Sequence, residues 1–152
     1  MRKFKNKKAI KVYLMIQFER SFIMLCNDQT EGECLERNLF GDKAKRFEYL
    51  DEIKPGDIGF LLNIYKDELI GIFRACSEAQ LHIEPDAWHG KFAAQVRVEL
   101  IRNLQRIKDA TYILNKAGVG MGQLASGAPA PQYPVHGQDV GEKILSNFKE
   151  SI

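Results

Sequence analysis

The chain has 152 residues, of which 45% are apolar, and this size fits one domain around a single core. No stretch reaches the roughly 18 apolar residues that a membrane span needs, and three cysteines without C-x-x-C spacing exclude a disulfide framework or structural zinc site. The net charge of +2 divides into +6 for residues 1–20 and −4 for the rest. The body of the protein therefore lacks the broad positive electrostatic field that drives non-specific binding of nucleic acid. We expect a soluble, cytoplasmic protein with no membrane partner.

Residues 1–20 form a predicted basic arm, with six Lys or Arg ahead of Val12. The apolar run that follows is too short for a signal peptide, and Gln17 and Glu19 stand where small cleavage-site residues belong. The arm either adds phosphate contacts or is a solvated tail. A start at Met15 is an alternative, so the sequence leaves open whether residues 1–14 belong to the native product.

Residues 21–27 predict a central strand covered on both faces, because apolar residues occupy every position from 22 to 26. A helix over 31–40 is expected next. Thr30 and Glu33 match the capping-box spacing at its start, and Gly41 fits a left-handed residue at its end.

A hairpin is the clearest pattern in the middle of the chain. Residues 42–54 predict a short helix or an ordered loop, and Pro55-Gly56 predicts a type II turn. The strand 58–65 and its antiparallel return 68–76 follow, separated by a short polar turn.

Three further elements are expected after a polar connection. Residues 94–100 alternate as in a half-exposed strand, and a short helix runs from the Asp109 cap to 117, ended by Gly118. A final helix starting near Asp139 packs through Val140 and later apolar residues.

These elements predict an α+β fold in four parts. The basic arm 1–20 precedes a core over 21–117, then a Gly/Pro-rich loop at 118–137 with little regular structure, and a C-terminal helix within 138–152 that packs on the core. The sequence does not decide whether the 118–137 loop acts as a lid.

The order of motifs resembles the DCD (development and cell death) domain family. The matching fragments span residues 22–98, about half of the chain; they are FIMLCN at 22–27, CLER at 34–37, LFG at 39–41, FLLN at 60–63, LIGIF at 69–73, DAW at 86–88 and FAAQVRV at 92–98. The family's Phe-Gly-Leu-Pro motif reads Phe40-Gly41-Asp42-Lys43 here, and the Pro before Ala-Gln-Val-Arg is Ala93. Both departures reduce rigidity locally.

The resemblance implies a small mixed or antiparallel β-barrel of PUA-like type with peripheral helices, similar in layout to EVE and YTH domains. It implies no enzymatic activity and no cofactor. Fold alone does not fix function.

Four residues are candidates for a ligand pocket. Asn27 ends a strand and could hold a base edge or form an Asx turn. Asn63 is an amide in an apolar strand and must find partners, in a ligand or in the backbone, with Tyr65 on the same face. Trp88, the only tryptophan, could stack on a base or fill the core.

Arg97 and Lys91 are candidate phosphate contacts, although Arg97 could instead pair with a carboxylate on a neighbouring strand. The three histidines lack metal-ligand spacing, and no nucleophile has a positioned base, so we predict neither a metal site nor catalysis.

The sequence thus predicts a non-enzymatic module that binds single-stranded RNA or DNA, or a modified nucleotide, in a PUA-like pocket. The alternative is a protein-interaction adaptor, of a stress or cell-death type, that uses a sheet edge or the Pro-rich segment 127–134.

Overall fold

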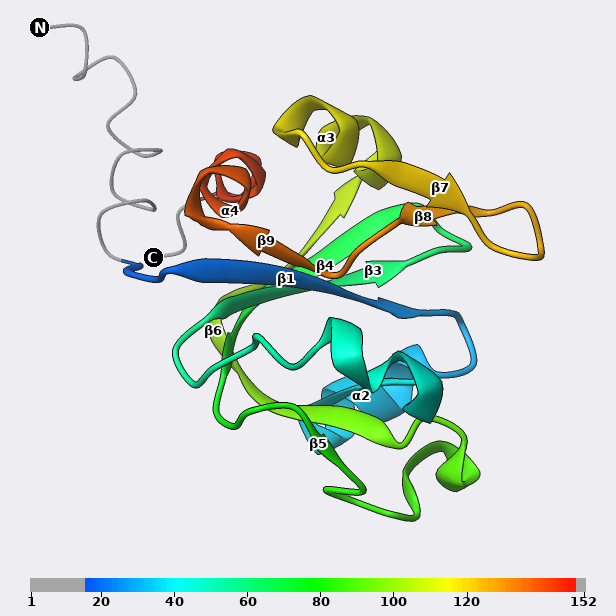
Figure 1. Cartoon of the computed structure of the whole chain (residues 1–152). Helices are drawn as coiled ribbons and strands as arrows, with labels where there is room; N and C mark the ends of the chain where they lie inside the picture. Colours follow the sequence, from blue (N-terminus) through cyan, green and yellow to red (C-terminus); the bar gives the residue numbers. More distant parts are fainter. Residues whose placement is uncertain (1–15, 150–152) are drawn as a thin grey trace, which may run out of the picture.

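The computed structural model describes residues 16–149, so most of the predicted basic arm lies outside the described residues. Within them, a main sheet of seven strands has the order β2-β6-β4-β3-β1-β9, with β5 also paired to β6 (Figure 1). Its strands are β1 (Arg20–Cys26), β2 (Leu39–Asp42), β3 (Ile58–Asn63), β4 (Glu68–Ala75), β5 (Gln80–Leu81), β6 (Ala94–Lys108) and β9 (Val135–Gly137). A separate hairpin consists of β7 (Met121–Gln123) and β8 (Pro129–Pro131), and the helices are α2 (Glu31–Arg37), α3 (Ala110–Ala117), α4 (Gln138–Leu145) and the 3-10 turns Ala44–Tyr49 and Ala87–Gly90.

The sheet is covered on both faces, as the apolar pattern of residues 21–27 predicts. Phe22 and Met24 of β1 pack into a cluster with α2 and the 3-10 turns, whereas Ile23 packs into a second cluster with α3 and α4. Figure 1 shows α3 and α4 on one side of the sheet and α2 on the other. β1 pairs in parallel with β3 and antiparallel with the short β9, so the strand is internal to the sheet.

The long strand β6 curls the sheet into a half-barrel. Its residues 98–108 pair with β4, and its first residues, 94–97, pair with β2 and β5. A bulge in the β4–β6 ladder lies at Gly71, whose φ of +70° and close contact with the Phe73 ring suit only a residue without a Cβ. The predicted strand at 94–100 is confirmed and continues to Lys108, but its predicted alternation is broken, because Gln95 is buried and Leu100 is exposed.

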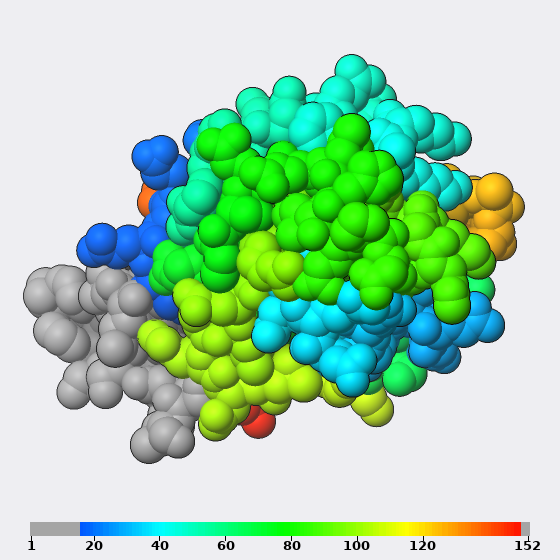
Figure 2. Space-filling model, turned by 90° about the horizontal axis from the view of Figure 1, so that it is seen from below, coloured from blue at the N-terminus to red at the C-terminus, as the bar shows by residue number. Residues whose placement is uncertain are grey.

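Seen from below, residues 76–93 form much of the central surface of the molecule (Figure 2, green). They lie between helix α2 and the segment after β2, and the hairpin β7–β8 shows at the edge of this view (Figure 2, orange). The connection predicted only as polar therefore forms one surface of the molecule, next to α2.

The predicted start of helix α2 at residue 31 is confirmed, but the predicted capping box and the predicted end were wrong. Thr30 is the N-cap residue, but its hydroxyl bonds to Asn27 rather than capping the helix, and Glu33 accepts a hydrogen bond from the Trp88 backbone. The helix ends at Arg37 because Asn38 adopts the left-handed conformation expected of Gly41. Gly41 instead lies in strand β2, where the Trp88 indole occupies the space of a Cβ.

The hairpin β3–β4, the helix-ending Gly118 and the start of the last helix are confirmed. Asp109, however, is left-handed and does not cap α3; Asp67 accepts hydrogen bonds from the backbone and hydroxyl of Thr111 instead. The expectation of little regular structure at 118–137 was also wrong, because β7, β8 and β9 lie there. Short three-residue strands give a weak pattern among glycines and prolines.

No helix within residues 16–149 is long and apolar enough to cross a membrane.

Candidate functional site

A pocket with a volume of about 900 Å³ opens where strand β1 meets helix α2. Its walls come from five parts of the chain that are distant in sequence: the end of β1 with the start of α2, residues 41–49, Ile64, residues 88–92, and residues 122–133. Pockets of about 300–1,000 Å³ typically hold small ligands, so this one has room for a nucleotide.

Two exposed tyrosine rings line the pocket. Tyr49 follows the basic segment after β2, and Tyr133 follows the hairpin. Tyr49 is 40% exposed to solvent and Tyr133 is 58% exposed. The centroids of the two rings are 5.9 Å apart. The guanidinium of Arg46 lies 5.0 Å from the Tyr49 ring centre. These rings offer accessible aromatic faces beside a cation.

The charge of the lining is positive, with Lys43, Lys45 and Arg46 against the single carboxylate of Asp42. Asp42 accepts hydrogen bonds from the Lys43 backbone at 2.7 Å and from Arg46 at 2.9 Å. Its acceptor capacity is therefore engaged, and among the described residues neither lysine ammonium has an acidic partner. This side of the pocket favours an anionic ligand.

Asn27 lines the pocket, and its side chain is held in a fixed orientation. Its side-chain oxygen accepts hydrogen bonds from the backbone of Gln29 at 2.8 Å and of Thr30 at 3.0 Å, the geometry of an Asx turn. These two bonds identify which side-chain atom of Asn27 is the oxygen. The other atom is the amide nitrogen, a donor that has no hydrogen-bond partner within residues 16–149. The sequence offered an Asx turn and a ligand contact as alternative roles for Asn27, and the two roles are compatible.

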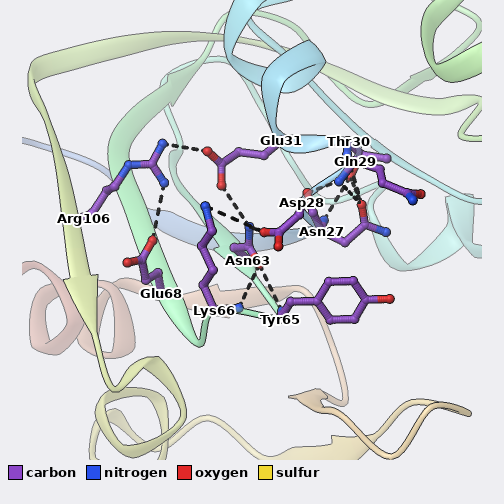
Figure 3. A network of polar contacts seen from close by, with 10 residues as sticks. All are labelled: Asn27, Asp28, Gln29, Thr30, Glu31, Asn63, Tyr65, Lys66, Glu68 and Arg106. Atoms are coloured by element: carbon purple, nitrogen blue, oxygen red, sulfur yellow. Dashed lines mark hydrogen bonds and ion pairs between the residues drawn. The ribbon is translucent and has the colours of Figure 1, made fainter.

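Asn63 is fully buried and is not part of the pocket lining (Figure 3). Its nitrogen donates to Asp28 at 3.0 Å and to Glu31 at 2.9 Å, and its oxygen accepts from the backbone of Tyr65 and Lys66 at 3.0 Å each. All its hydrogen-bonding capacity is used. Asn63 therefore bridges protein groups, and Tyr65, 64% exposed, also lies outside the lining.

Glu31 connects this network to the sheet. One carboxylate oxygen accepts from Asn63 and the other from Arg106 of β6 at 2.6 Å, while Arg106 also reaches Glu68 at 3.4 Å (Figure 3). Hydrogen bonding to Arg106 lowers the pKa of Glu31 against the opposing effect of burial.

Replacing Arg106 by glutamine is expected to make acid destabilisation begin at higher pH. In the native protein, ionised Glu31 stabilises the fold fully at pH values above its ordinary pKa of 4.5. This stabilisation is lost as the pH falls through the lower pKa that Glu31 has in the folded protein. Without the guanidinium, burial raises that pKa. Urea unfolding between about pH 7 and about pH 3 measures this, with Lys143→Gln as the exposed control. Identical pH profiles for the two variants would contradict the role of Arg106.

Trp88 forms a wall of the pocket rather than an open face. Only 4% of its surface is exposed, its backbone is left-handed with φ of 50°, and its indole nitrogen donates to the Thr30 carbonyl at 3.4 Å. Phe92 packs edge-on against it at 5.9 Å. In this conformation the indole has too little free surface to stack on a base, and it supports Thr30 and the Asx turn.

The two predicted phosphate contacts lie outside the pocket lining. Arg97 pairs with Glu84 at 2.6 Å and donates to the Arg37 carbonyl at 2.8 Å, in a cluster that also holds Glu33. Lys91 is exposed between the lining residues Trp88 and Phe92 and makes no ion pair within the described residues.

Cys26 and Cys34 contribute neutral thiols to the pocket. Burial raises the pKa of both, that of Cys34 to about 12. Among residues 16–149 no group of three or more His, Cys, Asp or Glu side chains is arranged to hold a metal ion.

The model of the development and cell death domain matches residues 20–114, which include strands β1 to β6 and the first part of helix α3. The chain belongs to the development and cell death (DCD) domain family. The predicted family resemblance is confirmed. Similar DCD proteins include NRP-B of Glycine max, 34% identical over 98 residues that cover 60% of this chain and 30% of that protein. The chain spans between 23% and 41% of the length of the plant relatives it matches.

Solved YTH domains have the same fold as this DCD domain. The Mmi1 YTH domain matches with a TM-score of 0.61 at 15% identity over 84% of this chain and 92% of that one. The Pho92 YTH domain, in complex with m6A, matches with a TM-score of 0.59 at 13% identity over 88% and 85%. The predicted α+β, PUA-like fold class is confirmed.

The structure brings Asn27 and Trp88 into one pocket and leaves Asn63, Tyr65, Arg97 and Lys91 outside its lining. Sequence reasoning missed Tyr49, Tyr133 and the basic segment after β2. The closely spaced basic residues Lys43, Lys45 and Arg46, with a tyrosine three positions on, were the available signal.

Proposed function

We propose that this DCD domain is a non-enzymatic module that binds single-stranded nucleic acid by holding one base, with or without a modification, in the pocket. The observation that supports the proposal is the combination, in one pocket, of exposed tyrosine rings, lysines without an acidic partner among residues 16–149, and the amide of Asn27 held by the Asx turn. Stacking on aromatic rings beside a positive groove is the general mode of single-strand binding.

The Asn27 donor gives the pocket a preference for a base edge that carries an acceptor. Its amide nitrogen is held in place by the Asx turn, so little ordering is needed when it meets a ring nitrogen or carbonyl. Solved YTH domains of similar fold include complexes with RNA and with m6A, which supports a nucleotide as the ligand class.

The protein-adaptor alternative receives less support. The Pro-rich segment 127–134 is built into the fold, because β8 pairs with β7 and the Pro134 carbonyl accepts a hydrogen bond from Ile23 of β1. It would have to leave these partners to enter an aromatic groove on another protein.

The test is fluorescence anisotropy with labelled short single-stranded RNA and DNA, with and without a methylated base, over a range of salt concentrations. We expect saturable binding that weakens with salt, by a slope of about 0.7 per phosphate contact. No binding of any oligonucleotide at low salt would overturn the proposal.

Replacing Lys43 and Lys45 together by glutamine is expected to reduce the salt slope by about 1.4, since each lysine contacts one phosphate in this account. Lys116→Gln, on the exposed side of α3 and outside the pocket lining, is the control and should leave the slope unchanged. An unaltered slope in the double variant would mean that phosphates do not pass this side of the pocket.

A further inference from the structure

Tyr65 is an exposed aromatic residue on the turn between β3 and β4, immediately beside the pocket. Its ring retains 64% of its surface, and the preceding residue, Ile64, lines the pocket. The Ile64 backbone donates to the Cys26 carbonyl at 3.0 Å, so the turn is joined directly to the residue before Asn27. The Tyr65 ring is therefore close to the Asn27 turn without belonging to the pocket wall.

The backbone under Tyr65 is rigid. The backbone N–H groups of Tyr65 and Lys66 both donate to the Asn63 oxygen, and Asn63 is anchored through Asp28 and Glu31 on the far side of the Asx turn. Figure 3 shows the ring of Tyr65 extending away from this network, with no dashed contact to the ring. When a ligand binds to the ring, only the side-chain torsions of Tyr65 have to be ordered. The loss of conformational entropy on binding is therefore small.

The next residue, Lys66, supplies a cation on the same turn. The Lys66 ammonium is 3.7 Å from an Asp28 oxygen, and both side chains are about half exposed, at 47% and 53%. Such a surface pair contributes little and is readily exchanged for a phosphate. An open tyrosine face and an exchangeable cation on a fixed turn are the components of a stacking subsite.

We propose that Tyr65 is a second stacking surface, outside the pocket, for the base adjacent to the one that the pocket holds. The inference rests on the proposed function and extends it, because it makes the ligand a strand of at least two nucleotides rather than a free nucleotide. In this role Asn63 is a positioning residue that holds the backbone of the turn on which Tyr65 lies.

The test compares a mononucleotide with a trinucleotide by isothermal titration calorimetry on the full chain. The probes are adenosine monophosphate and the trinucleotide of adenosine, each with and without the N6-methyl group. We expect the trinucleotide to bind the unaltered protein about tenfold more tightly or better, Tyr65→Ala to abolish that gain without changing mononucleotide affinity, and Tyr65→Phe to retain it.

The outcomes separate this inference from the proposed function. If both probes bind and Tyr65→Ala leaves the trinucleotide advantage intact, or weakens both probes equally, the outer subsite is wrong while the pocket stands. If neither probe binds the unaltered protein, both proposals fail. Tyr112→Ala, an equally exposed tyrosine on α3, is the matched control and should change neither affinity.

Discussion

Replacing Asn63 by alanine is expected to lower the free energy of unfolding by about 3–5 kcal/mol, because it leaves several hydrogen-bonding groups around a buried side chain without partners. The change removes the amide N–H groups that donate hydrogen bonds to Asp28 and Glu31. It also removes the amide oxygen that accepts from two backbone N–H groups. Each buried group left unsatisfied costs about 1–3 kcal/mol. Urea unfolding followed by Trp88 fluorescence measures the loss.

Asn115→Ala is the matched control for this prediction, because Asn115 is exposed on helix α3 and a surface substitution there should stay within about 0.5 kcal/mol. A loss below about 1 kcal/mol in the Asn63 variant would mean that water replaces the missing amide and that the network does not stabilise the turn.

Replacing Tyr49 and Tyr133 together by alanine is expected to weaken oligonucleotide binding about 100-fold, or about tenfold for each ring, while leaving the fold intact. The rings face the pocket with about half of their surface exposed, so truncation removes stacking area without opening the core. Anisotropy titration of the double variant and of each single variant measures the effect.

Two controls exclude unfolding of the variant and a general effect of removing a surface tyrosine as causes of weaker binding. The unfolding midpoint of the double variant should match that of the unaltered protein, and Tyr112→Ala should bind as tightly as the unaltered protein, since Tyr112 lies outside the pocket lining. Undiminished binding by the double variant would place the base elsewhere on the surface.

Much of the fold could be predicted because its signals are local. The hairpin 58–75 follows from two apolar runs joined by a short polar turn, and Gly118 ends α3 where a left-handed residue is needed. The end of α2 could not be predicted this way, because Asn38 and Gly41 both suit a left-handed residue and Gly41 is required instead by the Trp88 ring.

The site depends on contacts between segments distant in sequence, and this limits what the sequence reveals. The need of Asn63 for partners follows from its apolar surroundings, but its partners Asp28 and Glu31 lie more than 30 residues away. Tyr133 stands in a segment that reads as an irregular loop, and only the hairpin β7–β8 brings it to Tyr49.

The most direct measurement is two-dimensional ¹H–¹⁵N NMR of the labelled chain during titration with a short single-stranded RNA. The single tryptophan gives one indole signal, and the Asn27 side-chain amide gives a second probe inside the pocket. We expect both signals, and the backbone signals of Lys43 to Tyr49, to shift in a saturable manner. Shifts confined to residues outside the pocket, or none at all, would contradict the account.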